Sequence, residues 1–124
     1  MSGDLLRNSS SRECRKLRSD LASRVDRVLK NALLGVYLAL NTAARLRYGV
    51  GFAELLVCEP RKAMSVLAEY ADGSDATAEF VIRAALTAVS CSDDVIEELV
   101  KMLREGRYEE FKAALHNAFE EASQ

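Results

Sequence analysis

The chain has 124 residues, about the length of one ordinary domain, which can bury a core without disulfides or metals. Only one proline and six glycines interrupt it, and β-branched residues do not alternate at the period of a strand, so the composition predicts helices. No stretch reaches the roughly 18 apolar residues of a membrane-spanning helix. The first ten residues include Asp4 and Arg7 and lack the apolar segment of a secretory signal. We therefore expect a cytoplasmic protein that does not enter a membrane.

Charge is divided unevenly along the chain. Residues 1–50 contain ten basic and four acidic residues, a net charge of +6, whereas residues 51–124 contain seven and fifteen, a net charge of −8. A chain divided in this way is expected to bind an acidic partner with its first half, or to pair front to back with another copy of itself.

The first predicted element is one long helix from Ser11 to Tyr48. Ser10 and Glu13 fit a capping box at its start, and Gly49 fits the left-handed residue that commonly follows a helix. A straight helix of this length would measure on the order of 57 Å, whereas a globule of this chain length has a radius of gyration of about 14 Å. The helix is therefore expected either to break, near Ser19–Asp20, or to project and pack on another chain, and we favour projection.

Both halves of this helix have a distinct pattern. The basic first half carries apolar residues at steps of three or four, which predicts one apolar stripe. From Ala32 to Leu40 the sequence is apolar on nearly every side of the helix, and this second half is therefore expected to be buried.

Four further helices follow in chain order. Residues 50–56 indicate a loop with one short helical turn, and Pro60 is well suited to the first position of a helix that ends at Asp72–Gly73. Ser74 and Ser92 each begin another helix, and Gly106 separates the last two. The predicted fold is an all-α bundle of about five helices with a long N-terminal helix. We expect residues 1–9 to form a flexible tail and residues 10–124 to form a single helical domain.

A resemblance to a known family rests on a set of short motifs in residues 31–86. They are Ala32-Leu33-Leu34, Tyr37-Leu38, Tyr48-Gly49-Val50, Glu54-Leu55-Leu56, Glu59-Pro60, Leu67, Gly73, Phe80-Val81-Ile82 and Leu86. In these motifs the chain resembles the Nitrosopumilus output domain, a small archaeal helical domain. The resemblance covers about half of the chain, and it implies an all-α module that is often attached to archaeal signalling or regulatory proteins and has no assigned activity. It therefore transfers no functional residue to this chain.

The apolar stripe on the first half of the long helix is the candidate surface for self-association. If a partner helix covered this stripe, each fully buried side chain would contribute on the order of 1.5–3 kcal/mol. The alternative is that the stripe folds back onto its own bundle, and the length of the helix favours a dimer. The residues of the stripe are Leu17, Leu21, Val25 and Val28.

Basic residues on the same helix are a candidate surface for nucleic acid, because basic side chains neutralise phosphates. Glu13, Asp20 and Asp26 interrupt the basic run, and no aromatic residue lies among the basic ones, so a solvated helix face explains the pattern more simply. The candidate contacts are Arg12, Arg15, Lys16, Arg18, Arg24 and Arg27.

A small anion site is a further candidate, at the turn between residues 45 and 62. Four basic residues, Arg45, Arg47, Arg61 and Lys62, are close in the sequence there, although surface ion pairs account for them more simply.

Catalytic and metal chemistry has little support in the sequence. Cys14, Cys58 and Cys91 are far apart and form no C-x-x-C pair, and His116 is the single histidine, so we expect reduced cysteines and no metal or cofactor. His116 is expected to be exposed, and no catalytic residue is assigned. The sequence therefore predicts a protein-interaction or regulatory module without catalytic activity that self-associates through its first helix. Nucleic-acid binding by the basic part of that helix is the alternative.

Overall fold

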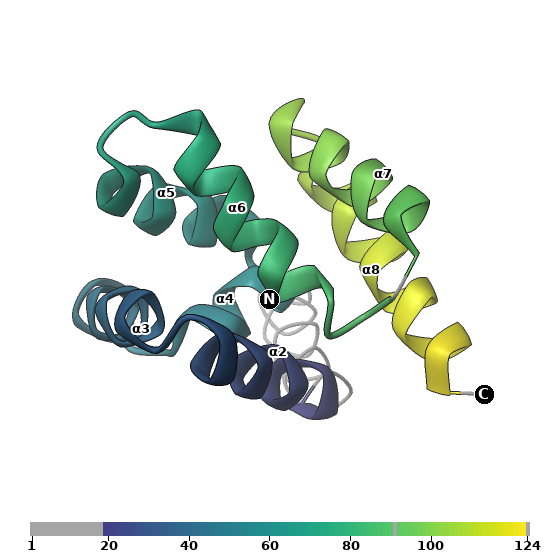
Figure 1. Ribbon diagram of the computed structural model, residues 1–124, viewed down its shortest axis with the longest axis horizontal. Coiled ribbons are helices and arrows are strands. Elements are labelled where there is room, and N and C mark those ends of the chain that lie inside the picture. The colour runs from purple at the N-terminus through teal and green to yellow at the C-terminus, as the bar shows by residue number, and fades with distance from the viewer. Residues whose placement is uncertain (1–18, 91, 124) are drawn as a thin grey trace, which may run out of the picture.

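The computed structural model describes residues 19–90 and 92–123, and it places seven α-helices and no strand in these ranges. In chain order they are α2 (Ser19–Ala32), α3 (Leu34–Tyr48), α4 (Phe52–Cys58), α5 (Pro60–Ala71), α6 (Asp75–Leu86), α7 (Asp93–Arg104) and α8 (Tyr108–Ser123) (Figure 1). The prediction of an all-α fold is confirmed. The expected bundle of about five helices is wrong for these residues, because the predicted first helix is divided and the predicted turn after residue 50 is a helix of its own.

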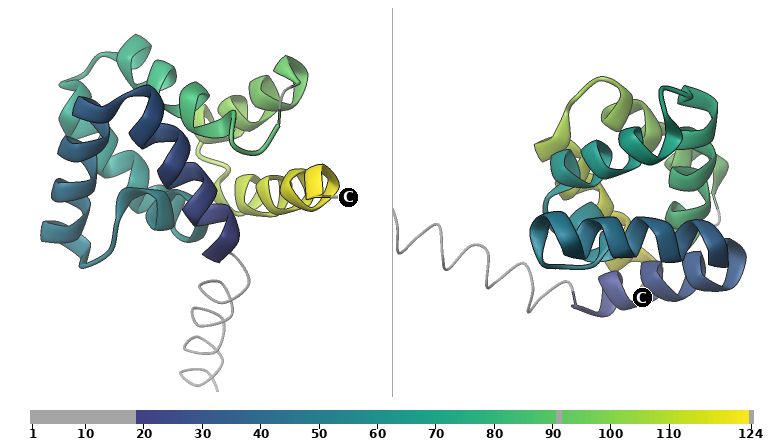
Figure 2. Two further views of the ribbon diagram at one scale, coloured as in Figure 1. Left: turned by 60° about the horizontal axis from the view of Figure 1, so that its bottom comes forward. Right: turned by 90° about the vertical axis from the view of Figure 1, so that its left-hand side faces the viewer.

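The predicted long helix is interrupted at Leu33, which separates α2 from α3. Leu33 has a φ of −140° and a ψ of 60°, and its N–H still donates to the carbonyl oxygen of Leu29 at 2.8 Å. The chain therefore changes direction with little loss of backbone hydrogen bonding, and α3 leaves the bend along a different axis from α2 (Figure 2). Residues 11–18 of the predicted helix and the predicted tail lie outside the described residues.

The bend lets both helices pack within the same globule. α2 lies against α4 and α6, whereas α3 lies against α4 and α5. The described part of the predicted helix does not project from the bundle, because α2 buries Leu21, Val25 and Leu29 against these neighbours. The length expected for the first helix assumed that it is continuous. Because the chain bends at Leu33, that length does not exist and gives no reason for projection.

Helix α4 lies at the centre of the fold, in contact with α2, α3, α5 and α8. Five of its seven residues are buried, among them Phe52, Leu55 and Leu56. The Asn41 side chain of α3 holds the start of this helix, because its Oδ1 accepts a hydrogen bond from the Phe52 N–H at 3.2 Å. Gly51 makes room for that contact, since a Cβ at this position would lie 2.6 Å from Asn41 Oδ1.

Local signals in the sequence correctly predicted several helix ends. Gly49 has a φ of 79°, and its N–H donates to the Arg45 carbonyl oxygen at 2.9 Å, as expected for a left-handed residue after a helix. Pro60 is the first residue of α5, and the Ser74 hydroxyl accepts from the Thr77 N–H at 3.2 Å at the start of α6. These caps fix the ends of α3, α5 and α6.

The helices are arranged along the longest axis of the molecule with α3 at one end and the α7–α8 hairpin at the other (Figure 1). α6 lies between these two ends, since it contacts α2 and α5 as well as α7. Every buried side chain among the described residues is apolar. None of the described helices is both long enough and apolar enough to cross a membrane.

Candidate functional site

The stripe predicted for self-association faces the core of its own chain. Leu21 and Val25 are 0% exposed, and Val28 is half-buried against the same core. Leu17 lies outside the described residues. The prediction that this stripe is a free surface is therefore wrong for Leu21 and Val25, because α4 and α6 of the same chain already cover them.

The outer side of α3 is apolar and exposed. Leu34 and Leu38 are each 53% exposed and Leu46 is 82% exposed, so α3 carries three of the five large apolar side chains that are exposed in the described residues. The helix buries Leu40 and Ala44 on its opposite side. Between residues 34 and 44 it carries no charged residue. We call the exposed side chains of Leu34, Leu38 and Leu46 the α3 face.

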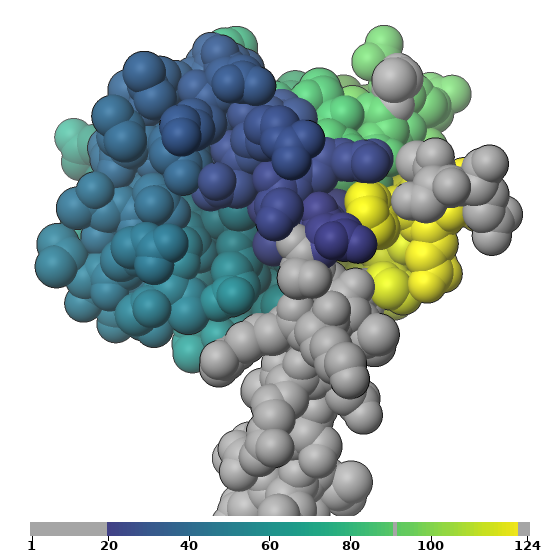
Figure 3. Space-filling model, turned by 90° about the horizontal axis from the view of Figure 1, so that it is seen from below, coloured from purple at the N-terminus to yellow at the C-terminus, as the bar shows by residue number. Residues whose placement is uncertain are grey.

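This face corrects the expectation that the second half of the long helix is wholly buried. A helix that is apolar on every side is ordinarily covered on every side. Here the neighbouring helices cover only one side of α3, because α3 lies at the end of the molecule. The surface formed by α2 and α3 is seen in Figure 3, in purple to blue, with the end of α8 beside α2.

The residues predicted to contact nucleic acid are only partly described. Arg12, Arg15, Lys16 and Arg18 lie outside the described residues. Arg24 and Arg27 are exposed on α2, and the Arg24 guanidinium lies 5.3 Å from the centroid of the Phe119 ring of α8. Arg24 therefore contributes to packing within the chain.

The four residues of the predicted anion site do not converge. Arg47 and Lys62 lie over the Tyr48 ring, at 5.2 and 5.3 Å from its centroid, whereas the Arg61 guanidinium lies 5.0 Å from the centroid of the Tyr108 ring. Arg45 faces a different part of the surface. The two cations at Tyr48 also have acidic partners, because Arg47 pairs with Glu69 and Lys62 pairs with Glu59, both at 2.8 Å.

Arg45 instead lines a polar hollow of about 200 Å³ between α2, α3 and α4. Asp26, Tyr37 and Glu54 line the same hollow. Burial raises the pKa of Tyr37, a hydrogen bond with Asp26 and the charge of that carboxylate raise it further, and the charge of Arg45 opposes this shift. The phenol therefore stays protonated at neutral pH.

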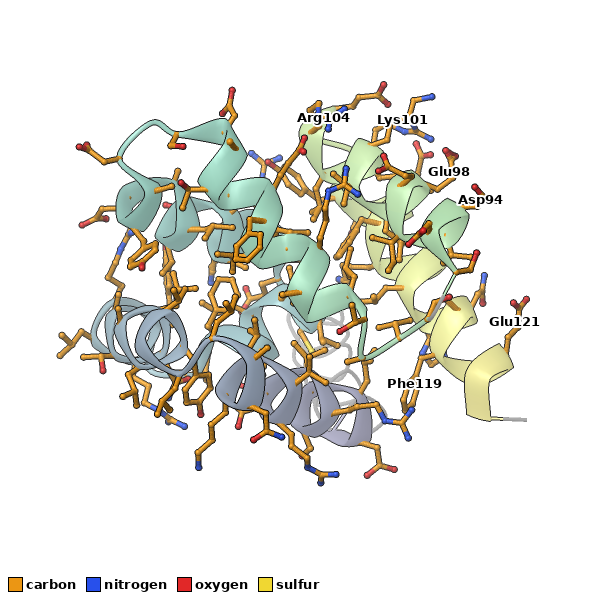
Figure 4. All side chains as sticks on the ribbon, in the orientation of Figure 1. Asp94, Glu98, Lys101, Arg104, Phe119 and Glu121 are labelled. Atoms are coloured by element: carbon orange, nitrogen blue, oxygen red, sulfur yellow. The ribbon has the colours of Figure 1, made fainter. Side chains whose placement is uncertain are left out.

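A crevice between α7 and α8 is the second candidate surface. It has a volume of about 290 Å³ and is lined by Asp94, Val95, Glu98 and Leu99 of α7 and by Ala114 of α8. Leu99 is buried and forms part of the core, and Val95 and Ala114 are half-buried against it. The carboxylates of Asp94 and Glu98 project from the outer side of α7, away from α6 (Figure 4). We call these five residues the α7–α8 crevice.

A third hollow, of about 330 Å³, lies between α5, α6 and α7 and is bordered by ion pairs. Glu79 of α6 pairs with Arg104 of α7, and Arg83 of α6 pairs with Glu97 of α7. The hydrogen bond from Arg83 lowers the pKa of Glu97, and the same bond raises the pKa of Arg83. These pairs hold α6 against α7, so we interpret this hollow as part of the packing between the two helices.

The described residues that could bind a metal or undergo redox chemistry are the histidine, cysteine and acidic side chains. No group of three or more histidine, cysteine or acidic side chains in residues 19–90 and 92–123 is arranged to hold a metal ion. His116 is half-buried, not exposed as expected, and its Nε2 lies 2.8 Å from Glu120 Oε1. Cys58 is disulfide-bonded, so the prediction of reduced cysteines is wrong for this residue.

Comparison with known proteins gave no relative: no family model, no curated protein and no solved structure matches this chain. The resemblance to the Nitrosopumilus output domain therefore stays a prediction.

Proposed function

We propose that this chain is a non-catalytic protein-interaction module that self-associates through the α3 face. The observation that carries the proposal is the exposure of Leu34, Leu38 and Leu46 on α3, a helix that has no charged residue between residues 34 and 44. Contiguous apolar surface on a protein commonly marks an interaction site. The proposal keeps the function expected from the sequence and moves the contact from the first part of the predicted helix to its second part.

The strength of this contact follows from the exposed fractions. Full burial of a leucine side chain contributes roughly 1.5–3 kcal/mol. With 53%, 53% and 82% of the three side chains still exposed, their burial contributes about 3–6 kcal/mol. The partner surface that they cover adds a comparable amount. Because association itself costs about 4–15 kcal/mol, we expect micromolar affinity or weaker.

Sedimentation velocity over a range of protein concentrations tests the proposal. The wild-type chain is expected to associate at tens of micromolar, and Leu38→Glu is expected to remain monomeric because a carboxylate cannot enter an apolar contact without a partner. Thr87→Glu is the matched control, since Thr87 is exposed just after α6 and its substitution adds the same charge away from α3. A wild-type chain that is monomeric at all these concentrations would contradict the proposed function.

Nucleic-acid binding is the less favoured alternative. Arg24 and Arg27 are the described members of its predicted contacts, and Asp20 and Asp26 lie on the same helix. A cytoplasmic location also stays a prediction. The disulfide bond of Cys58 counts against this location, because disulfides persist mainly in oxidising compartments.

A further inference from the structure

The α7–α8 crevice has the properties that a partner for the α3 face requires. We infer that the α3 face of one copy docks into the α7–α8 crevice of a second copy, so that the two copies associate head to tail. This inference rests on the proposed function, because it names the surface that receives the leucines.

The first reason is the chemistry of the two surfaces. The floor of the crevice is apolar, and its volume of about 290 Å³ is open to solvent beside the half-buried Val95 and Ala114. Protruding leucines on one copy therefore meet an apolar hollow on the other. Arg45 is exposed on α3 about two turns after Leu38, and it also lines the polar hollow with Asp26 and Glu54. Asp94 and Glu98 border the crevice, so docking brings a guanidinium towards two carboxylates. None of these three charged groups forms an ion pair with another described residue of its own chain.

The second reason is the charge of the larger surfaces around them. Residues 19–48, which form α2 and α3, contain five basic and two acidic residues, a net charge of +3. Residues 93–123, which form α7 and α8, contain four and nine, a net charge of −5. Docking head to tail brings opposite charges together, which favours both encounter and orientation. Pairing α3 with α3 of a second copy would instead bring two basic surfaces, and two Arg45 side chains, into proximity.

The third reason is the position of the surfaces. α3 and the α7–α8 hairpin lie at opposite ends of the longest axis of the molecule (Figure 1). After two copies have docked, one of them still offers a free α3 face and the other offers a free crevice. Such a contact is heterologous, and it adds further copies unless the rotation between neighbours closes a ring. The association is therefore expected to continue beyond a dimer as the concentration rises.

Two variants that each remove one side of the contact test this geometry. Leu38→Glu removes the α3 face and keeps the crevice, whereas Asp94→Lys combined with Glu98→Lys removes the crevice and keeps the α3 face. Each variant alone is expected to be monomeric by sedimentation velocity. An equimolar mixture is expected to form a heterodimer that grows no further, because only one intact contact can form between the two variants.

A control and the salt dependence complete the experiment. Glu109→Lys combined with Glu121→Lys changes the charge of the same hairpin by the same amount outside the crevice, and it is expected to associate like the wild-type chain. Raising the salt from about 50 mM to about 500 mM is expected to weaken wild-type association about tenfold, because the exposed charges become screened. Circular dichroism confirms that each variant is folded, and Asp94→Asn with Glu98→Gln provides a milder form of the crevice variant.

The outcomes separate the inference from the proposed function. If the crevice variant associates like the wild-type chain while Leu38→Glu is monomeric, the α3 face is used but the crevice is not, and the inference is wrong. The inference is also wrong if both variants are monomeric and their mixture stays monomeric. If the wild-type chain itself does not associate, the proposed function has failed and the inference fails with it.

Discussion

Replacing Gly51 with alanine should change the stability of the protein in opposite directions, depending on residue 41. In the wild-type chain the new Cβ would lie 2.6 Å from Asn41 Oδ1, so the Asn41 side chain must move and its hydrogen bond to the Phe52 N–H is lost. The loss leaves a donor without a partner at the start of a buried helix, which costs about 1–2 kcal/mol. Asn41→Ala alone is expected to cost a similar amount for the same reason.

In the Asn41→Ala background the steric conflict no longer exists. Gly51 has a φ of −73° and a ψ of 161°, a conformation that alanine adopts without strain. Gly51→Ala should then stabilise the protein by about 0.4–1 kcal/mol, because alanine reduces the freedom of the unfolded chain.

Urea unfolding of the four proteins in this double-mutant cycle measures both effects, and thermal unfolding should report about 3–5 °C per kcal/mol for a chain of this size. A loss of stability of the same size in both backgrounds would refute the reasoning, because the cost would then not depend on the contact with Asn41.

Two further predictions concern the buried stripe of α2 and the ion pairs between α6 and α7. Leu21→Ala is expected to lower the free energy of unfolding by about 2–5 kcal/mol because Leu21 is fully buried, whereas Leu46→Ala on the α3 face should change it by less than about 0.5 kcal/mol. Chemical denaturation at low protein concentration measures both changes. Equal losses would contradict the assignment of Leu21 to the core and of Leu46 to the surface. Arg83→Gln is expected to lower the melting temperature slightly at pH 6 and to have no effect near pH 2. The hydrogen bond from Arg83 lowers the pKa of Glu97 in the folded state. The stabilisation is therefore present above the unfolded pKa of about 4.3 and is lost as the pH falls through the folded pKa. A difference in melting temperature between the wild-type chain and the variant that persists at pH 2 would exclude this pair as its source.

The ends of the helices could be predicted from the sequence because local chemistry determines them. Gly49, Pro60 and Ser74 act through their own backbone conformation or through hydrogen bonds to residues a few positions away. The interruption at Leu33 has no such local signal. Leu29 and Leu40, on either side of it, are eleven residues or about three turns apart, so the apolar stripe stays in phase and resembles that of one continuous helix.

The candidate surfaces were harder to predict because neighbours that are distant in the sequence decide them. Arg47 and Arg61 are close in the chain, but they lie over the rings of Tyr48 and Tyr108 in different parts of the surface. Similarly, the spacing of Leu21 on α2 could not indicate whether its own bundle or a second chain covers it. The α7–α8 crevice has no signal in the sequence of α7 alone, because its apolar floor beside Asp94 and Glu98 requires Ala114 of α8.

The composition of α3 connects the fold with the proposed assembly. A helix that is apolar on nearly all sides is expected to be covered on all sides. Within one copy of this chain only the side of α3 that carries Leu40 and Ala44 is covered. If a second copy covers Leu34, Leu38 and Leu46, the expectation of a buried helix is met in the oligomer although it fails in the isolated chain. Hydrogen exchange of the whole chain at low and high concentration would show this as slower exchange of α3 amides on association, together with slower exchange in α7 if the crevice is the receiving surface.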